Sequence, residues 1–186
     1  ARGVEVHGIE LSNAMVARMR AKPGGEEIGV TIGDFSTTRV EGTFSLVYLV
    51  FNTIMNLTTQ AGQVDCFRNA AAHLAPGGRF VIEVLVPGLQ RLPVGTTRQV
   101  LYSDEGSFGF DEIDVATQAL VSNHFTFAAG TLERVSIPFR YAWPAELDLM
   151  AQLAGMTLDG RWAGWRREPF VAESSSHVSV WAVPSA

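Results

Sequence analysis

Residues 4–12, which read VEVHGIELS, constrain the fold more than any other stretch of the chain. The β-branched residues Val4, Val6 and Ile9 predict a short buried strand, and Glu10 stands where that strand should end. Ser12 then offers an N-cap to a helix whose apolar residues fall on one face. A strand, an acidic residue and a capped helix in this order are typical of a doubly wound α/β sheet. In such sheets, ligands bind beyond the carboxyl ends of the strands.

Composition narrows the class of protein. The length of 186 residues suits one domain, and the 47% of hydrophobic residues argues against disorder. The net charge of −5 argues against a nucleic-acid surface, which needs clustered cations. A single cysteine, Cys66, precludes an internal disulfide, which fits a cytoplasmic protein. We expect the Cys66 side chain to be buried and to serve only in packing. Apolar runs are too short for a membrane span, and we expect no membrane partner.

The rest of the first half continues the α/β pattern. Strands are predicted at residues 28–32, 44–51 and 79–86, and the second of these is apolar enough for a central parallel strand. Between the last two, Thr59 caps an amphipathic helix that Pro76 and the following glycines end. The resulting order, β-α-β-β-α-β, predicts a mostly parallel sheet with right-handed crossovers.

The pattern changes at residues 89–141. Helical periodicity disappears there, and polar alternation predicts several antiparallel strands that form either an inserted sheet or a cap over the ligand cleft. Its strands are expected at residues 98–102, 108–116, 119–127 and 132–141. A helix should then begin at Pro144, because proline is favoured at the first helical position. Strands near residues 156–162 and 177–183 would close the sheet as a terminal antiparallel pair.

Four segments resemble the class I methyltransferases that use S-adenosylmethionine (SAM). Residues 6–12 are similar to the family's second strand with its ribose-binding acid, and residues 32–35 to the loop whose acid meets the adenine amino group. Residues 46–53 are similar to the strand beside the methionine part of SAM, and residues 74–82 to the turn before the fifth strand. The resemblance implies a Rossmann-like fold and SAM as the cofactor. The cofactor-binding residues that it implies are Glu10, Leu11, Gly33, Asp34, Phe35, Val50, Phe51 and Asn52.

One departure from the family leads to a structural expectation. In the family, a first strand and a glycine-rich loop precede the strand that matches Val4, and this sequence contains neither. The first strand would lie between the strands at Val4 and Phe44. We therefore expect a gap there with unpaired backbone groups, as in an element cut from a longer polypeptide.

Several of these residues also have an ordinary structural interpretation. Glu10 fits a surface acid near a helix start, Asp34 fits a common turn, and Phe51 fits the core. His124 lies in the inserted sheet on the face of Leu120, Ser122 and Thr126. It is a candidate general base, although a cross-strand hydrogen-bonding histidine fits the same pattern. Glu83 lies among apolar residues, where it would face the cleft or pair with an arginine.

The resemblance predicts an enzyme that moves a methyl group to a nitrogen or oxygen atom of a small molecule. The inserted sheet is similar in position to the extra sheet of small-molecule and aminosugar N-methyltransferases. Two alternatives stay open at this point: an NAD-dependent oxidoreductase, which also places an acid after a second strand, and a truncated non-catalytic interaction module. The four histidines show no metal-ligand spacing, so no metal is expected. A small molecule is the expected partner, and a homodimer is compatible with the sequence.

Overall fold

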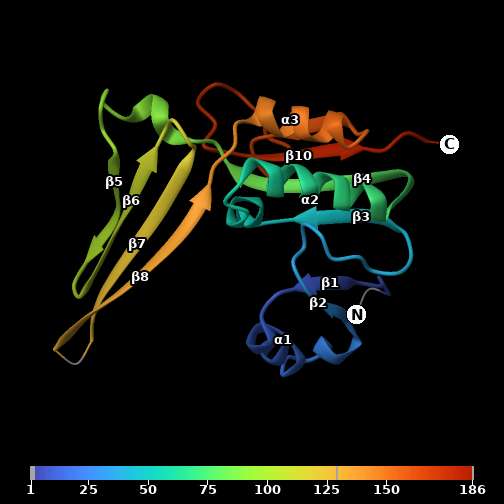
Figure 1. Ribbon diagram of the computed structural model, residues 1–186, viewed down its shortest axis with the longest axis horizontal. Coiled ribbons are helices and arrows are strands. Elements are labelled where there is room, and N and C mark those ends of the chain that lie inside the picture. Colours follow the sequence, from blue (N-terminus) through green and yellow to red (C-terminus); the bar gives the residue numbers. More distant parts are fainter. Residues whose placement is uncertain (1–2, 129, 186) are drawn as a thin grey trace.

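The computed structural model describes residues 3–128 and 130–185, and it contains three separate sheets (Figure 1). The first sheet is the parallel pair β1 (His7–Glu10) and β2 (Gly29–Ile32). Helix α1 (Asn13–Arg20) follows β1, and the Ser12 hydroxyl accepts a hydrogen bond from the Met15 backbone N–H at 3.3 Å, as predicted for the cap. A short 3-10 turn, η1 (Gly25–Glu27), leads from α1 to β2.

The start of the first strand differs from the prediction. The strand begins at His7, and Val4 is exposed instead of buried. The apolar face of α1 also lacks fully buried residues. The physical reason is that β1 pairs with β2 on one edge only, so the layer that would cover these side chains is not among the described elements.

The second sheet forms the centre of the molecule. Its strand order is β3-β4-β10-β9, in which β3 runs parallel to β4 while β10 is antiparallel to both β4 and β9. The predicted closing antiparallel pair is therefore confirmed. The bounds are β3 (Phe44–Leu49), β4 (Leu74–Leu85), β9 (Thr157–Trp162) and β10 (Ser176–Ala182).

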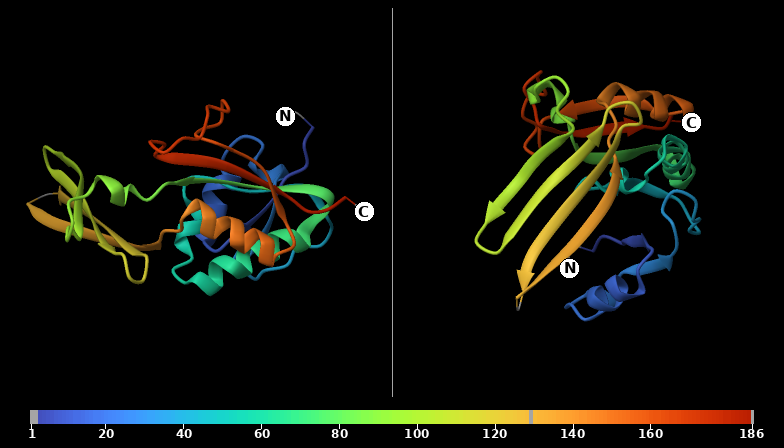
Figure 2. Two further views of the ribbon diagram at one scale, coloured as in Figure 1. Left: turned by 90° about the horizontal axis from the view of Figure 1, so that it is seen from above. Right: turned by 60° about the vertical axis from the view of Figure 1, so that its left-hand side comes forward.

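Two helices, α2 (Gln60–His73) and α3 (Pro144–Leu153), cover one face of this sheet (Figure 2). Both begin where the sequence predicts, since the Thr59 hydroxyl caps α2 and Pro144 opens α3. The core beneath them is aromatic. The ring of Phe67 meets the rings of Phe80 and Trp181 edge-on, at centroid distances of 5.1 and 5.3 Å.

The expected gap lies between the first two sheets. β1 and β3 are not hydrogen-bonded to one another, and a cavity of about 400 Å³ separates them. Ile9 of β1, Val47 of β3 and Ala70 of α2 are among the residues that line this cavity, which we call the interstrand cavity. Tyr48 is half exposed, so β3 is not the fully buried central strand that its apolar sequence predicts. Burial of a strand depends on both of its neighbours, and here β3 pairs only with β4.

The third sheet is the predicted insertion. Its four antiparallel strands pair in chain order and stand at the side toward which β1 and β3 point (Figure 1). They are β5 (Arg98–Asp104), β6 (Ser107–Asp114), β7 (Ala119–Ala128) and β8 (Thr131–Arg140). Two 3-10 segments, η2 (Thr53–Asn56) and η3 (Gly88–Arg91), lie in the connections after β3 and β4.

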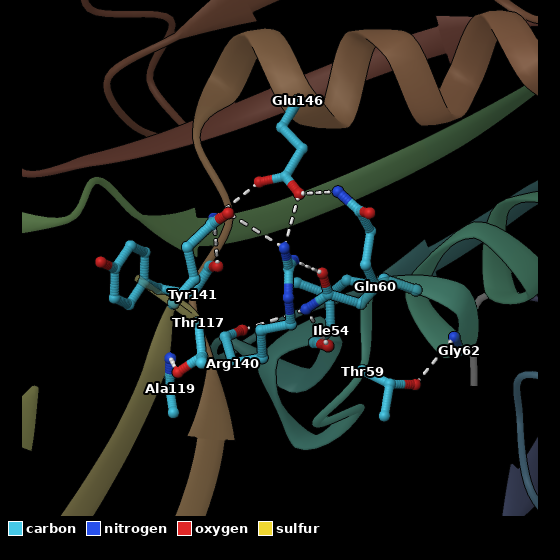
Figure 3. A network of polar contacts seen from close by, with 11 residues as sticks. Ile54, Thr59, Gln60, Gly62, Thr117, Ala119, Arg140, Tyr141 and Glu146 are labelled. Atoms are coloured by element: carbon cyan, nitrogen blue, oxygen red, sulfur yellow. Dashed lines mark hydrogen bonds and ion pairs between the residues drawn. The ribbon is translucent and has the colours of Figure 1, made fainter. Parts of the chain in front are cut away.

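A buried polar network joins the insertion to the helices (Figure 3). Arg140 at the end of β8 pairs with Glu146 of α3 at 2.7 Å, and it also donates to the Gln63 side-chain oxygen of α2 at 2.6 Å. Gln118 donates to the other oxygen of Glu146 at 2.7 Å. Burial acts to raise the pKa of Glu146, but the hydrogen bonds from Gln118, Arg140 and Gln60, together with the charge of Arg140, hold it below its usual value.

Candidate functional site

Glu10 lies at the carboxyl end of β1, opposite Ile32 of β2. One oxygen of its carboxylate accepts the Ser12 backbone N–H at 2.8 Å, which fixes the side chain beside the start of α1. The Gly33 N–H donates to the Glu10 carbonyl at 3.1 Å, so the loop after β2 begins directly beside Glu10. The second carboxylate oxygen has no hydrogen bond to a described residue. Leu11, the next predicted residue, is largely exposed.

Asp34 is held in a similar way one strand further along. Its Oδ1 accepts the backbone N–H and the hydroxyl of Ser36, both at 2.8 Å, while no described residue is hydrogen-bonded to Oδ2. Gly33 precedes it at a close approach, because a Cβ there would lie 2.1 Å from the Thr38 hydroxyl oxygen. Phe35 follows, lining the interstrand cavity and packing against the core.

Helix α2 holds this loop through two residues that sequence reasoning missed. The Asn69 amide donates to the carbonyls of Phe35 at 2.8 Å and Thr38 at 2.9 Å, and the His73 Nε2 accepts the Val40 N–H at 2.9 Å. Both side chains are buried. Their loop partners lie about thirty positions earlier in the chain, so local sequence patterns carry no signal for these contacts.

The turn after β3 has an unusual backbone. Phe51 and Asn52 both adopt left-handed conformations, with φ values of 53° and 61°, and non-glycine residues in this region are held there by their surroundings. The Asn52 side-chain oxygen accepts the Leu85 N–H at 2.7 Å, and its own N–H donates to the Glu83 carbonyl. The Phe51 side chain is 86% exposed, so its interpretation as a core residue is wrong. Val50, directly before it, accepts a hydrogen bond from the Thr53 hydroxyl.

Glu83 stabilises this turn from the neighbouring strand β4. One carboxylate oxygen accepts the Phe51 N–H at 3.2 Å, and the other accepts the Trp165 indole N–H at 2.9 Å. Of the two alternatives left open for Glu83, pairing with an arginine is therefore wrong. Instead, Glu83 links the turn after β3 to the loop between β9 and β10, and sequence reasoning did not anticipate Trp165 as its partner.

His124 lies on β7 with both ring nitrogens occupied. Its Nδ1 is 3.1 Å from the Tyr102 hydroxyl, and its Nε2 is 3.1 Å from the Ser122 hydroxyl. Asp111 of β6 lies opposite Ser122 in the strand register, and burial raises the pKa of its carboxyl while the Ser122 side chain and the charge of His124 offset this in part. His124 thus forms a hydrogen bond across the sheet, as its structural interpretation predicts, and its role as a general base stays a prediction. Tyr102 is a partner that sequence reasoning missed.

The structure groups these residues into two sets on one side of the molecule. Glu10 and the Asp34 loop are neighbours at the ends of β1 and β2, while Phe51, Asn52 and Glu83 form the second set at the ends of β3 and β4. Both sets lie at carboxyl ends of strands that point toward the inserted sheet (Figure 1), where ligands bind in open α/β sheets. The carboxylates of Glu10 and Asp34 each have one oxygen without a hydrogen bond to a described residue, and the Phe51 ring is exposed. These groups suit a ligand that has hydroxyl or amino donors and a flat ring.

Other reactive groups do not add to this site. Burial and the nearby charge of Asp34 raise the pKa of the Cys66 thiol, so it stays protonated at neutral pH. Within residues 3–128 and 130–185, no group of His, Cys, Asp or Glu side chains is arranged to hold a metal ion. Among the helices formed by those residues, none is long and apolar enough to cross a membrane.

Known proteins are similar to this chain over most of its length. A family model described as a methyltransferase domain matches residues 1–78. The cypemycin N-terminal methyltransferase of a Streptomyces species is 26% identical over 181 residues, which make up 96% of this chain and 74% of the relative.

Solved structures extend the likeness to the inserted sheet. The CcbJ methyltransferase from Streptomyces caelestis is 36% identical, with a TM-score of 0.86 over 99% of this chain and 76% of that chain. CalS10, a SAM-bound amino pentose methyltransferase from Micromonospora echinaspora, has the same fold at 22% identity, with a TM-score of 0.68 over 96% of this chain and 73% of that one. The predicted Rossmann-like α/β fold is confirmed by these matches.

Proposed function

Because the chain belongs to the SAM-dependent methyltransferases, we propose that it transfers a methyl group to a nitrogen atom of a small molecule. The observation that carries this proposal is the pair of carboxylates, Glu10 and Asp34, at the ends of two parallel strands. Family membership argues against the NAD-dependent oxidoreductase that the sequence left open. A homodimer and a cytoplasmic location stay predictions.

The residues at this edge fit the cofactor by their donor and acceptor chemistry. The free oxygen of Glu10 would accept hydrogen bonds from the ribose hydroxyls, each worth roughly 1.5–3 kcal/mol for a charged acceptor. Asp34 would accept the adenine amino group, and the Phe35 side chain would form a wall of the adenine pocket. The remaining residues of the proposed binding surface are Leu11, Gly33, Val50, Phe51 and Asn52.

SAM, when bound, supplies a methyl group that its sulfonium already activates. The protein therefore contributes mainly alignment of the acceptor with that methyl group, and alignment accounts for roughly 7–11 kcal/mol in well-oriented reactions. General-base catalysis adds about 10²–10⁴-fold, and His124 together with the Tyr102 hydroxyl bonded to it is the candidate for it. Support for nitrogen as the acceptor comes from the names of similar proteins, an N-terminal methyltransferase and a sugar N-methyltransferase among them.

The test is a calorimetric titration of the protein with SAM. We expect Glu10→Ala to weaken binding by about tenfold or more, because one lost charged hydrogen-bond acceptor is worth roughly 1.4 kcal/mol or more. Glu27→Ala is the matched control, since this glutamate is exposed on η1. Equal affinities for the wild type and Glu10→Ala would contradict the assignment of Glu10, and binding of NAD but not SAM would contradict the proposed function.

A further inference from the structure

The polar side chains around His124 in the inserted sheet form a chain in which each donor points to the next acceptor in one direction. The proposed function does not by itself use this order. We propose that the Tyr102 hydroxyl, backed by His124, takes the proton from a protonated amine acceptor before methyl transfer. This proposal rests on methyl transfer to nitrogen, and it identifies the substrate class as an amine that is cationic in solution.

The direction of the chain follows from what each group is able to donate. Asp111 lies directly opposite Ser122 in the register of β6 and β7, and its carboxylate only accepts hydrogen bonds, so the single proton of the Ser122 hydroxyl is directed toward Asp111. The oxygen of Ser122 then accepts from His124, which places the ring proton on Nε2, at 3.1 Å from that oxygen. The Nδ1 of His124 is left as an acceptor.

Tyr102 is consequently the outer end of this chain. Its O–H donates to the His124 Nδ1 at 3.1 Å, which leaves the lone pairs of its oxygen open to a proton from outside. The phenol ring is only half buried, and it stacks on the imidazole at a centroid distance of 5.9 Å. His124 is therefore a positioning and proton-storing residue behind Tyr102, because both of its nitrogens are already engaged.

A glycine makes this approach feasible. Gly109 lies between the two residues in the sheet register, opposite Tyr102 on one side and His124 on the other. A Cβ at Gly109 would lie 2.6 Å from the Tyr102 ring carbon Cε1, so any larger residue would displace the ring. The absence of a side chain at this position is what lets the tyrosine cross one strand to reach the histidine.

The charges of the sheet favour a cationic ligand on this face. By register, Asp104, Asp111 and Glu133 share the face with Tyr102 and His124, and no arginine or lysine of the four strands does. The arginines of these strands, Arg98, Arg134 and Arg140, lie at register positions of the opposite face. The carboxylate face also carries Ile113 and Leu120, which join the hydrophobic core.

The proton step balances without a further reactant. The N–H bond of the ammonium breaks toward the Tyr102 oxygen, and its electron pair stays on nitrogen as the nucleophile. The phenol proton moves to the His124 Nδ1, which leaves an imidazolium, and Asp111 stabilises that charge through Ser122. The neutral amine would then be the nucleophile for the methyl group that bound SAM supplies, with the methyl–sulfur electron pair left on sulfur, and the imidazolium releases its proton to solvent.

The experiment uses glucosamine as the amine and glucose as its matched hydroxyl analogue, with SAM at saturation and methylated product measured by mass spectrometry. We expect the wild type to methylate glucosamine and not glucose. Tyr102→Phe should lower kcat/KM by about 100-fold, as for loss of a general base, and displace the pH profile toward higher pH, where free amine becomes abundant. Ser122→Ala should show a smaller loss, with Ser103→Ala, exposed on the opposite face of the sheet, as the control.

A second pair of variants tests the geometry. Gly109→Ala should reproduce the kinetic loss of Tyr102→Phe, whereas Gly88→Ala, which meets open space, should not. The SAM affinity of all variants should equal that of the wild type in calorimetry. Wild-type kcat/KM or an unshifted pH profile in Tyr102→Phe would overturn the role of Tyr102, and preference for glucose would overturn the amine. A wild type that does not bind SAM would instead overturn the proposed function.

Discussion

His177 is fully buried on β10, where its Nδ1 shares a hydrogen bond of 2.8 Å with the Ser179 hydroxyl. Its Nε2 has no hydrogen-bond partner among the described residues. Burial, together with the positive charge of Arg161, lowers the pKa of His177 from 6.5 to about 4, and Asp148 offsets this only in part. The imidazole is therefore neutral in the folded protein under conditions where an unfolded chain would protonate it.

This difference predicts a loss of stability in mild acid. Above pH 6.5 both states hold a neutral histidine; as the pH falls from 6.5 to about 4, the unfolded state gains a proton that the folded state does not. The free energy of unfolding should fall by up to about 3 kcal/mol across this window. Urea denaturation of His177→Gln should lack this part of the pH dependence. His7→Gln, at an exposed histidine, should retain it, and identical slopes for the wild type and His177→Gln would contradict the prediction.

Glu83 carries a second prediction at the scale of a residue. Its two oxygens accept from Phe51 and Trp165, and a glutamine amide in its place has only one oxygen to accept with. Glu83→Gln should weaken SAM binding by about fivefold, because loss of one hydrogen bond of roughly 1 kcal/mol loosens the strained Phe51–Asn52 turn. Trp165→Phe, which removes only the loop partner, should retain more affinity. Unchanged SAM affinity of Glu83→Gln in calorimetry would show that this turn does not contact the cofactor.

Among the secondary-structure elements, the joint between β8, α2 and α3 depends on one buried ion pair. Arg140→Met should lower the free energy of unfolding by about 3–5 kcal/mol, because the Glu146 carboxylate would remain buried without its cationic partner. The measurement is chemical denaturation. Arg68→Met is the control: its pair with Asp65 is exposed to water, and such pairs contribute less than about 1 kcal/mol. Equal losses in the two variants would contradict a special role for the buried pair.

Sequence patterns predicted elements better than they predicted burial. Ser12, Thr59 and Pro144 mark helix starts through local hydrogen bonds or a fixed φ angle, so their signals survive without tertiary information. Exposure of Val4 and Tyr48 depends on whether another strand lies alongside, which no local pattern records. The Glu83–Trp165 and Asn69–Phe35 contacts were missed for the same reason, because each joins segments far apart in the chain.

At the scale of the whole molecule, the interstrand cavity lies between a sheet of low local stability and a sheet of higher local stability. β1 and β2 form a two-stranded sheet, and such a pair is marginal in water, whereas β4 and β10 lie inside a four-stranded sheet under two helices. Hydrogen exchange should therefore show lower protection in β1 and β2 than in β4 and β10. Addition of SAM should raise the protection of β1, since Glu10 is proposed to bind it. Uniform protection across all four strands would contradict this division.

The chain enters the inserted sheet after β4 and leaves it just before α3. The Arg140–Glu146 ion pair fixes the end of the sheet to α3. Under the proposed function, the inserted sheet would select the acceptor and the loops after β1 and β2 would bind the cofactor, so the two roles would lie on separate segments of the chain. Residues 98–139 would be open to diversification or to replacement by the matching hairpins of a relative, while the loops after β1 and β2 stay unchanged. New acceptors for such an enzyme are best sought by varying that one module.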